Sequence, residues 1–319
     1  MACFRAVLLL LSFLAVAFST ADVQGSNATP PTPKKNGENK EVPGTATSTA
    51  PAVWSLRPSF RIPALSWPSV VPFMRRFVSS SQQTPGALDF GWSTAGDRLL
   101  WRGIYEDFEA MQRHHDALMH HVNDLVAETD ASLQRFEIHG PSLGLLRAPL
   151  EKKQLDPFFA LNADYFDVQE GSFSKWTSDT PKALCETHER FKVTDWAKAG
   201  PIMKEFNDLT SKEPGCVYSS WSKKGDDLSW VESYTDGDAV AKHFELTGPI
   251  IEKLLDGPAT LESAEVHGPR LELEKVKNIP KAFQTAFKPQ YFAIADDFNE
   301  GKLLKDLEQL SDKSASSEL

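Results

Sequence analysis

Residues 228–236 read Leu-Ser-Trp-Val-Glu-Ser-Tyr-Thr-Asp, and residues 99–107 read Leu-Leu-Trp-Arg-Gly-Ile-Tyr-Glu-Asp. The two stretches share Leu, Trp, Tyr and Asp in the same order and at the same spacing. Large apolar residues at every second position predict a strand, and the final Asp is a residue that commonly begins a helix. A strand-to-helix junction that occurs twice indicates an internal repeat.

The repeat extends to both sides of this junction, because identical residues recur at a constant separation. In the first copy they are Pro72, Met74, Phe77, Pro85, Gly86, Trp92, Ser93, Gly96, Asp97, Ala110 and His114, and in the second Pro201, Met203, Phe206, Pro214, Gly215, Trp221, Ser222, Gly225, Asp226, Ala239 and His243. The stretch 138–141, Ile-His-Gly-Pro, also returns as Val-His-Gly-Pro at 266–269. We therefore predict two tandem copies of one domain, at residues 50–170 and 181–298.

The second copy predicts a complete order of elements. We expect a strand at 183–193, then a helix capped by Asp195, then strands at 216–222 and 228–234. A second helix follows, capped by Asp236 or Asp238 and interrupted at Gly248-Pro249, and then a strand at 260–267. Residues 271–276 extend the sheet or begin a helix. This β-α-β-β-α-β order is the ferredoxin-like unit, so the predicted fold class is α+β with two tandem ferredoxin-like domains.

Helices cover only one face of such a sheet, and the other face has to be covered as well. Leu228, Trp230 and Tyr234 alternate onto one side of their strand. We expect this side to be the face without helices, packed against the twin copy. The two copies would then form an intramolecular pseudo-dimer.

The ends of the chain differ from the repeat in composition. Arg5, the apolar run 7–18 and small residues up to Ala21 predict a signal peptide at 1–21, too short for a membrane span. Residues 22–49 are rich in Pro, Thr and Ser and predict a disordered linker or transit-like segment. The expected destination is secretion, or a plastid reached through a bipartite leader. Residues 299–319 form an acidic tail, and no membrane span is expected after signal cleavage.

Composition excludes several classes of function. The chain has 319 residues, a formal net charge of -10 and a sequence pI near 5.3, which argue against binding to nucleic acid. Outside the leader only Cys185 and Cys216 occur, so no disulfide framework or cysteine metal site is predicted, and both are expected to be core residues.

The junction 228–236, the helix residues Ala239-Val240-Ala241-Lys242-His243-Phe244 and the turn 266–269 resemble the antibiotic biosynthesis monooxygenase (ABM) type of dimeric α/β barrel. The resemblance covers nearly all of the chain beyond the leader, because both copies carry versions of these motifs. It implies a barrel fold and a substrate pocket between sheet and helices. Relatives of this type include oxygenases for phenols and quinols that need no cofactor, haem-degrading enzymes, lactone isomerases and proteins without assigned chemistry.

The candidate catalytic residues belong mainly to the second copy. His243 is placed to act as acid, base or hydrogen-bond donor to a phenolic oxygen, or it is a satisfied core histidine. Alternation places Glu232 and Tyr234 on the same face as Trp230, where they bind a substrate or form the seam between the two sheets. His114 is the weaker candidate of the first copy, because Gly103 stands there in the position of Glu232.

The candidate substrate-binding residues are aromatic. Trp230 and Trp221 of the second copy, and Trp101 and Trp92 of the first, could stack on an aromatic small molecule or could pack the core. The His-Gly-Pro turns at His139 and His267 are expected to have a positional role.

No cofactor and no metal ion is predicted. The cluster His114, His115, His120 and His121 does not repeat in the second copy, and the residues that haem-degrading relatives use cannot be placed in this chain. Nucleotide-binding loops and a serine nucleophile elbow are not found either.

Three hypotheses follow from the sequence. In the first, the protein is a cofactor-independent, monooxygenase-like enzyme acting on a quinol or polyphenol. In the second, it is a non-catalytic dimeric α/β barrel that serves binding or assembly in its compartment. In the third, it is a chaperone-like carrier of an apolar ligand. An open pocket around Trp230 and His243 would favour the enzyme, and a filled interior would favour the non-catalytic barrel.

Overall fold

A computed structural model describes residues 54–141, 163–169, 171–176, 185–279, 284–285 and 287–294. The predicted signal peptide, the linker 22–49 and the acidic tail lie outside the described residues. In the described part of the chain, no helix combines the length and the apolar character needed to cross a membrane.

The first half runs from β1 to β4. Its elements are β1 (Trp54–Arg61), η1 (Ala64–Ser66), α2 (Trp67–Ser81), β2 (Ala87–Ala95), β3 (Arg98–Tyr105), α3 (Phe108–Glu128) and β4 (Ser132–Gly140). Two further strands, β5 (Ala163–Val168) and β6 (Phe173–Ser174), follow before the second half.

The second half runs from β7 to β11. Its elements are β7 (Cys185–Val193), α6 (Trp196–Thr210), β8 (Cys216–Lys224), β9 (Asp227–Tyr234), α7 (Gly237–Leu255), β10 (Ala259–Gly268), α8 (Arg270–Val276) and β11 (Gln290–Ile294). Both halves thus contain the order β-α-β-β-α-β that the sequence predicts, and the undecided stretch 271–276 is helical.

The predicted helix caps are present. The Asp195 side chain accepts a hydrogen bond from the Lys198 backbone amide (3.1 Å), and Asp236 accepts one from the Ala239 amide (2.8 Å). These bonds satisfy amides that have no partner within the first turn of a helix. The predicted interruption at Gly248-Pro249 is wrong, because α7 continues through Pro249.

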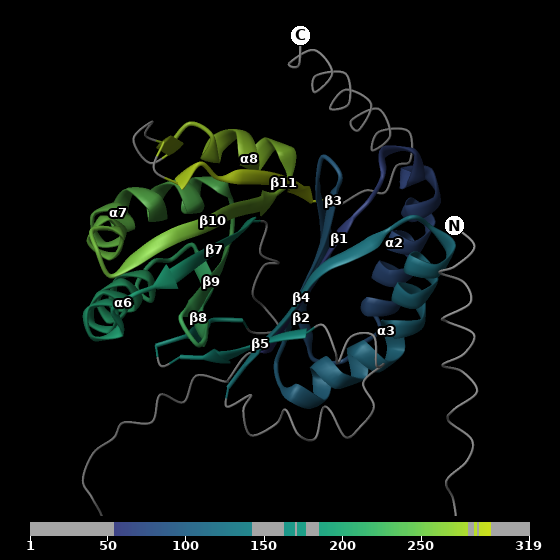
Figure 1. The fold of residues 1–319 in the computed structure, drawn as a ribbon, viewed down its shortest axis with the longest axis horizontal. Coiled ribbons are helices and arrows are strands. Elements are labelled where there is room, and N and C mark those ends of the chain that lie inside the picture. Colours follow the sequence, from purple (N-terminus) through teal and green to yellow (C-terminus); the bar gives the residue numbers. More distant parts are fainter. Residues whose placement is uncertain are drawn as a thin grey trace, which may run out of the picture. The chain divides into compact units, whose positions relative to one another are not determined.

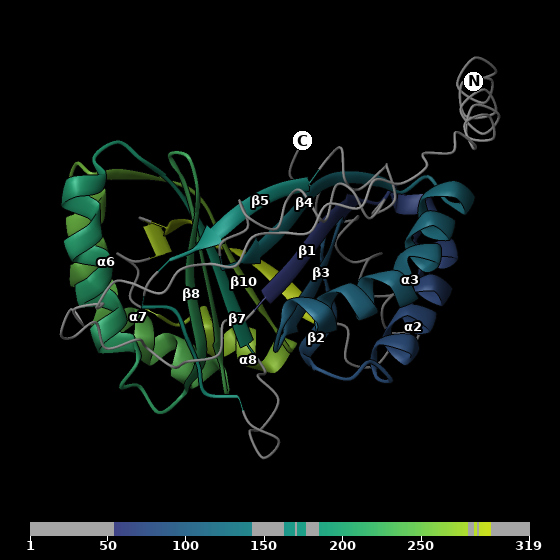
Figure 2. The same cartoon turned by 90° about the horizontal axis from the view of Figure 1, so that it is seen from below.

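The strands form one closed sheet (Figures 1 and 2). The order around the barrel is β5-β4-β1-β3-β2-β11-β10-β7-β9-β8, and β8 pairs with β5 to close it, while β6 is attached to β8. β5 is parallel to β4 and antiparallel to β8, and β11 is parallel to β10 and antiparallel to β2. β5 therefore connects β4 of the first half to β8 of the second, and β11 connects β10 of the second half to β2 of the first. Closure leaves the ten strands of the ring without a free edge.

The helices lie outside the barrel. α2 and α3 cover the strands of the first half, and α6 and α7 cover those of the second (Figures 1 and 2). Trp230 and Leu228 belong to a core cluster with Phe206 of α6 and Ile251 of α7. The expectation that this face of β9 packs against the twin copy is therefore wrong: it faces the helices. Cys185 and Cys216 are buried and free, as predicted.

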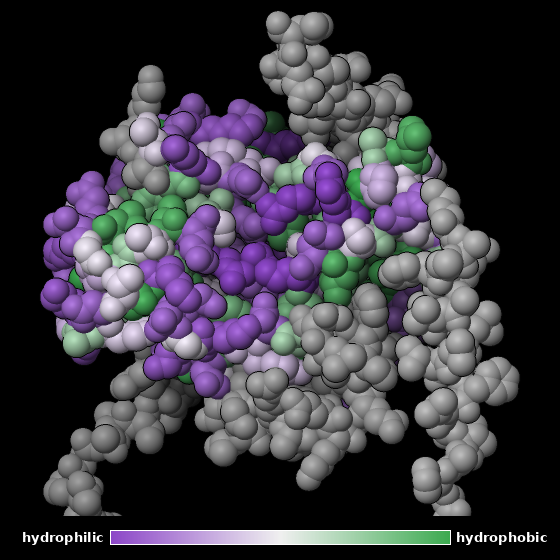
Figure 3. All heavy atoms as spheres, in the orientation of Figure 1, coloured by the Kyte–Doolittle hydropathy of each residue, from purple (hydrophilic) through white to green (hydrophobic). Residues whose placement is uncertain are grey.

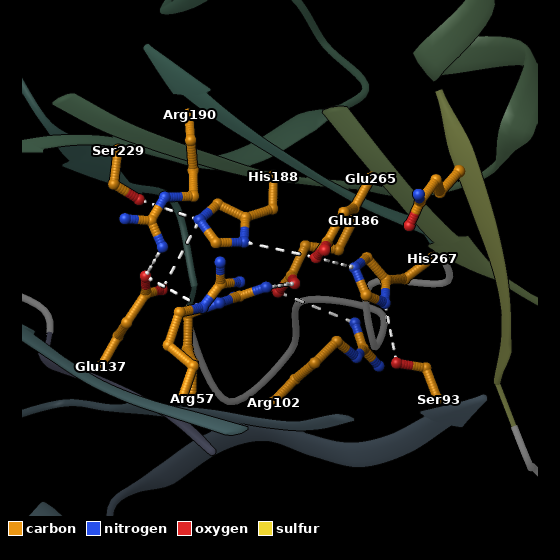
Figure 4. A network of polar contacts seen from close by, with 12 residues as sticks. Arg57, Ser93, Arg102, Glu137, Glu186, His188, Arg190, Ser229, Glu265 and His267 are labelled. Carbon is orange, nitrogen blue, oxygen red and sulfur yellow. Dashed lines mark hydrogen bonds and ion pairs between the residues drawn. The ribbon is translucent and has the colours of Figure 1, made fainter. Parts of the chain in front are cut away.

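The other face of the sheet lines the inside of the barrel and carries a network of polar side chains (Figure 4). Arg57 of β1 forms a buried ion pair with Glu186 of β7 (2.6 Å), which connects the two halves. His267 Nδ1 is hydrogen-bonded to Ser93 Oγ (2.7 Å). Correspondingly, His139 Nδ1 is hydrogen-bonded to Ser222 Oγ (2.6 Å). The two histidines that the sequence placed in turns thus hold the halves together from within.

Candidate functional site

Four of the predicted site residues meet between the sheet and the helices of the second half. Trp230, Glu232 and Tyr234 point from β9 toward α6 and α7, and His243 points from α7 toward β9. The side chains of all four are fully buried. The structure thus brings an indole, a carboxyl group, a phenol and an imidazole together. The alternation of side chains along β9 predicts this arrangement in part.

The polar groups of this site form a chain of contacts. The Tyr234 hydroxyl donates a hydrogen bond to Glu232 Oε2. His243 Nε2 lies 3.0 Å from the same oxygen, and its Nδ1 lies 2.9 Å from Glu213 Oε1. The imidazole is therefore held between two carboxylates.

These carboxylates determine the charge of His243. Burial alone would lower the pKa of His243, but Glu232 and Glu213 raise it to about 9. At neutral pH the ring is then an imidazolium that does not accept protons, and its Nδ1 donates a hydrogen bond to Glu213. Burial and the nearby Glu232 carboxylate raise the pKa of Tyr234 well above its usual value, so the phenol stays neutral.

Two residues of the site were missed by the sequence analysis. Glu213 follows α6, just before the predicted Pro-Gly stop, and no pattern distinguishes it from a surface residue. Glu189 lies on β7 opposite Trp230 and is buried. Burial, together with the negative charge of Glu232, raises the pKa of Glu189 well above its usual value, so it is a neutral acid. The site thus contains a neutral carboxylic acid close to the Glu232 side chain.

Glu232 has one oxygen that is not engaged. Its Oε2 takes part in the contacts with Tyr234 and His243, whereas its buried Oε1 has no hydrogen-bond partner among the described residues. A buried carboxylate oxygen without a partner is costly, and such groups are concentrated at functional sites. Oε1, unlike Oε2, is therefore not hydrogen-bonded within the site.

The aromatic side chains fill the space beside this array. Trp221 and Trp230 are stacked with ring centroids 4.6 Å apart, and Phe206 meets Trp230 edge-on at 4.0 Å. The Trp221 indole donates a hydrogen bond to Asn207 Oδ1 (2.6 Å). The predicted substrate-binding tryptophans therefore contact one another, and the site is closed in this conformation.

The first half places the corresponding residues in a similar arrangement with different chemistry. His114 Nδ1 is hydrogen-bonded to the Tyr105 hydroxyl, and its Nε2 to Ser81 Oγ (2.8 Å). Burial lowers the pKa of His114 to about 4, and the neighbouring His115 adds to this, so the imidazole is neutral. Trp92 and Trp101 are buried beside it in edge contact, with centroids 5.0 Å apart.

In the first half, the Tyr105 and Trp101 side chains occupy the place of a counterpart of Glu232. A Cβ atom on Gly103 would lie 2.3 Å from the Tyr105 hydroxyl oxygen. A cavity of about 20 Å³ lies nearby, lined by Leu56, Pro58, Trp101 and His114 among others. This volume suffices for about one water molecule. The two halves thus share a framework, but only the second has the buried acidic array.

In the described part of the chain, no group of three or more His, Cys, Asp or Glu side chains is arranged to hold a metal ion. No family model matches the chain, and no curated protein sequence matches it.

Several solved structures are similar to the chain. MupZ from Pseudomonas fluorescens is 30% identical, with 35% of this chain and 90% of that chain covered and a TM-score of 0.32. A candidate monooxygenase of Fusobacterium nucleatum is 12% identical over 68% of this chain and 91% of its own, with a TM-score of 0.47. A monooxygenase-like protein of Listeria innocua is 8% identical over 69% and 95%, with a TM-score of 0.35. These similarities are low, so we base the function on the side chains of this chain.

Proposed function

We propose that this protein is an oxidative enzyme of the ABM type, built from two tandem ferredoxin-like domains that form one barrel. Its working site is the buried array of the second half, and its substrate is a quinol or polyphenol. The reaction uses dioxygen and needs no cofactor, because the substrate supplies the electrons.

The observation that supports this proposal is the unengaged Oε1 of Glu232 beside the His243 imidazolium. Glu232 accepts the proton of the substrate hydroxyl, which leaves an electron-rich phenolate. His243 and the Tyr234 hydroxyl keep Glu232 in position, and the positive charge of His243 balances the negative charge of the site.

The overall reaction is a monooxygenation. The quinol ring gives four electrons to dioxygen and becomes a hydroxyquinone. One oxygen atom enters a ring C–H carbon as a hydroxyl group, and the other leaves as water with the two hydrogens of the quinol hydroxyl groups. Trp230 and Trp221 offer flat surfaces for the aromatic ring, and the rings that now fill the site have to separate when the substrate enters.

Oxygen uptake by the purified full chain, measured with a panel of quinols and polyphenols, tests this proposal. We expect Glu232→Gln to reduce the rate by about 10²–10⁴-fold, the usual contribution of a general base. Trp230→Phe should raise KM more than it changes kcat. Glu205→Gln is the matched control, because Glu205 is an exposed residue of α6 that pairs with Lys253. A Glu232→Gln protein as active as the wild type would contradict the proposal.

One observation favours a second candidate function. The site is filled by stacked rings and fully buried, as expected for a barrel that has kept the fold and serves binding or assembly without catalysis. No oxygen uptake with any substrate, in a protein shown by circular dichroism to be folded, would favour this alternative.

A further inference from the structure

A second, open site lies at one mouth of the barrel, away from the array around Glu232. A hollow of about 430 Å³ is lined by Ser59, Arg61, Asp97, Arg98, Gln134 and Arg135. These residues come from β1, the turn between β2 and β3, β3 and β4. The volume lies in the range of small-molecule sites in proteins, about 300–1,000 Å³.

The pairing of the strands brings the arginines together. Arg61 lies directly opposite Arg98 in the β1–β3 pair, and Arg135 lies directly opposite Ser59 in the β1–β4 pair. Like charges at directly opposed positions destabilise a sheet. An anion between these guanidinium groups would remove that repulsion.

The negative charges of the carboxylates near the mouth do not fully balance the positive charges of the arginines. Arg61 pairs with Asp97, and Arg98 pairs with Glu265. Glu137, however, is shared between Arg135 (3.2 Å from Arg135 Nε) and Arg190 of the opposite half. One carboxylate therefore serves two guanidinium groups, and a positive charge remains.

The arginines in and near the hollow also differ in how deeply they are buried. The exposed fraction of the side chain falls from 68% for Arg61 to 32% for Arg98, 25% for Arg135 and 14% for Arg190. Arg190 belongs to the polar network inside the barrel (Figure 4). An anion entering the hollow would thus meet guanidinium groups at increasing depth, where the lower dielectric strengthens the attraction.

At the corresponding position of the second half, a cation faces an anion instead of a second cation. There Lys192 lies opposite Asp227 and pairs with it at 2.9 Å, and Asp226 is adjacent in sequence. The cationic hollow is therefore a property of the first half, on a chain with a net charge of -10. Hydrophilic side chains also cover the middle of the face seen in Figure 3.

We propose that this hollow binds a small organic anion through a carboxylate or phosphate group, which Arg61, Arg98 and Arg135 contact together. Planar guanidinium groups bind both kinds of oxyanion through paired hydrogen bonds. The proposal does not depend on the reaction proposed for Glu232.

Isothermal titration calorimetry of the full chain tests the site with two probes, inorganic phosphate and citrate, at an ionic strength kept constant with chloride. We expect one saturable site for at least one probe, and the tighter probe identifies the chemical group. Arg61→Gln combined with Arg98→Gln should weaken binding at least about tenfold, because two of the three contacting charges are lost.

The control is Lys192→Gln, which removes a cation from the corresponding position of the second half and should leave the affinity within about twofold. Thermal unfolding in chloride shows whether each variant is folded, and Arg61→Gln alone provides a second variant at an exposed position. Absence of saturable binding for both probes, or equal weakening in the Lys192→Gln protein, would overturn the proposal.

Discussion

His243 and His114 occupy equivalent positions on α7 and α3, but their pKa values shift in opposite directions. Burial acts on both rings and lowers the pKa. For His243 the carboxylates of Glu232 and Glu213 outweigh burial and raise the pKa to about 9. His114 has hydroxyl partners instead, and its pKa falls to about 4. The same residue type is thus a cation in one half and a neutral ring in the other.

NMR titration of the histidine ring signals should resolve this contrast. We expect one histidine, lost in His243→Gln, to titrate near pH 9, and one, lost in His114→Gln, to titrate near pH 4. Two histidines with pKa values between 6 and 7 at these positions would show that the buried array is not charged as described.

The raised pKa of His243 also affects stability. Because it lies above the unfolded value of 6.5, the stabilisation is fully present below about pH 6.5 and is lost as the pH rises through 9. The shift corresponds to about 3 kcal/mol. The difference in unfolding free energy between wild type and His243→Gln should therefore shrink over this range, and chemical denaturation at pH 6 and pH 9.5 measures it. A constant difference would contradict this.

At the scale of the elements, β2 and β8 each provide a serine to a histidine of the opposite half. Ser93 is bonded to His267 of β10, and Ser222 to His139 of β4. Both histidines are buried, and burial lowers the pKa of each ring. These neutral rings therefore depend on the serine hydroxyls for hydrogen bonds across the barrel.

We expect Ser93→Ala and Ser222→Ala each to lower the free energy of unfolding by about 1–3 kcal/mol, because each leaves a buried ring nitrogen without its partner. Ser219→Ala is the control: Ser219 is buried on β8, and its hydroxyl has no hydrogen-bond partner among the described residues. Urea denaturation measures all three variants. Equal losses for Ser219→Ala and Ser222→Ala would show that the bond to His139 contributes nothing.

The order of the elements could be predicted from the sequence, whereas the orientation of β9 could not. Capping aspartates and apolar spacing mark Asp195 and Asp236 as helix starts. Alternation shows that Trp230 and Tyr234 share a face, but both faces of β9 are buried, from Leu228 to Tyr234. Hydrophobicity therefore does not decide which face meets the helices, and the prediction failed at this point.

The site could be predicted only in part, for a similar reason. Glu232, Tyr234 and His243 follow one another along the chain, so a strand and the next helix bring them together. Glu189 and Glu213 come from β7 and from the end of α6, and only tertiary structure places them at the site. The charge state of His243 depends on Glu213 as well as on Glu232, so it could not be predicted either.

At the scale of the whole molecule, the barrel depends on ion pairs that join its halves. Arg57 and Glu186 are both buried, and their contact at 2.6 Å spans the interior. Without Arg57, the buried charge of Glu186 would be balanced only by the more distant guanidinium group of Arg102, at 3.8 Å. Stability of the two halves should therefore be coupled through this pair.

We expect Arg57→Met to lower the free energy of unfolding by about 3–5 kcal/mol. Arg61→Gln is the control on the same strand: its pair with Asp97 is exposed, so the cost should be about 0–1 kcal/mol. Thermal and urea denaturation provide both values. Similar small losses in the two variants would mean that the halves hold together without the Arg57–Glu186 pair.

The central proposal is that only the second half carries chemistry. The most direct test compares oxygen uptake by His243→Gln and His114→Gln, with a substrate that the wild type oxidises and with folding of both variants verified. We predict that His243→Gln loses at least about 10²-fold in kcat, because Glu232 loses its cationic partner, while His114→Gln stays within about threefold of the wild type. Equal activity of the two variants, or a greater loss in His114→Gln, would contradict the account.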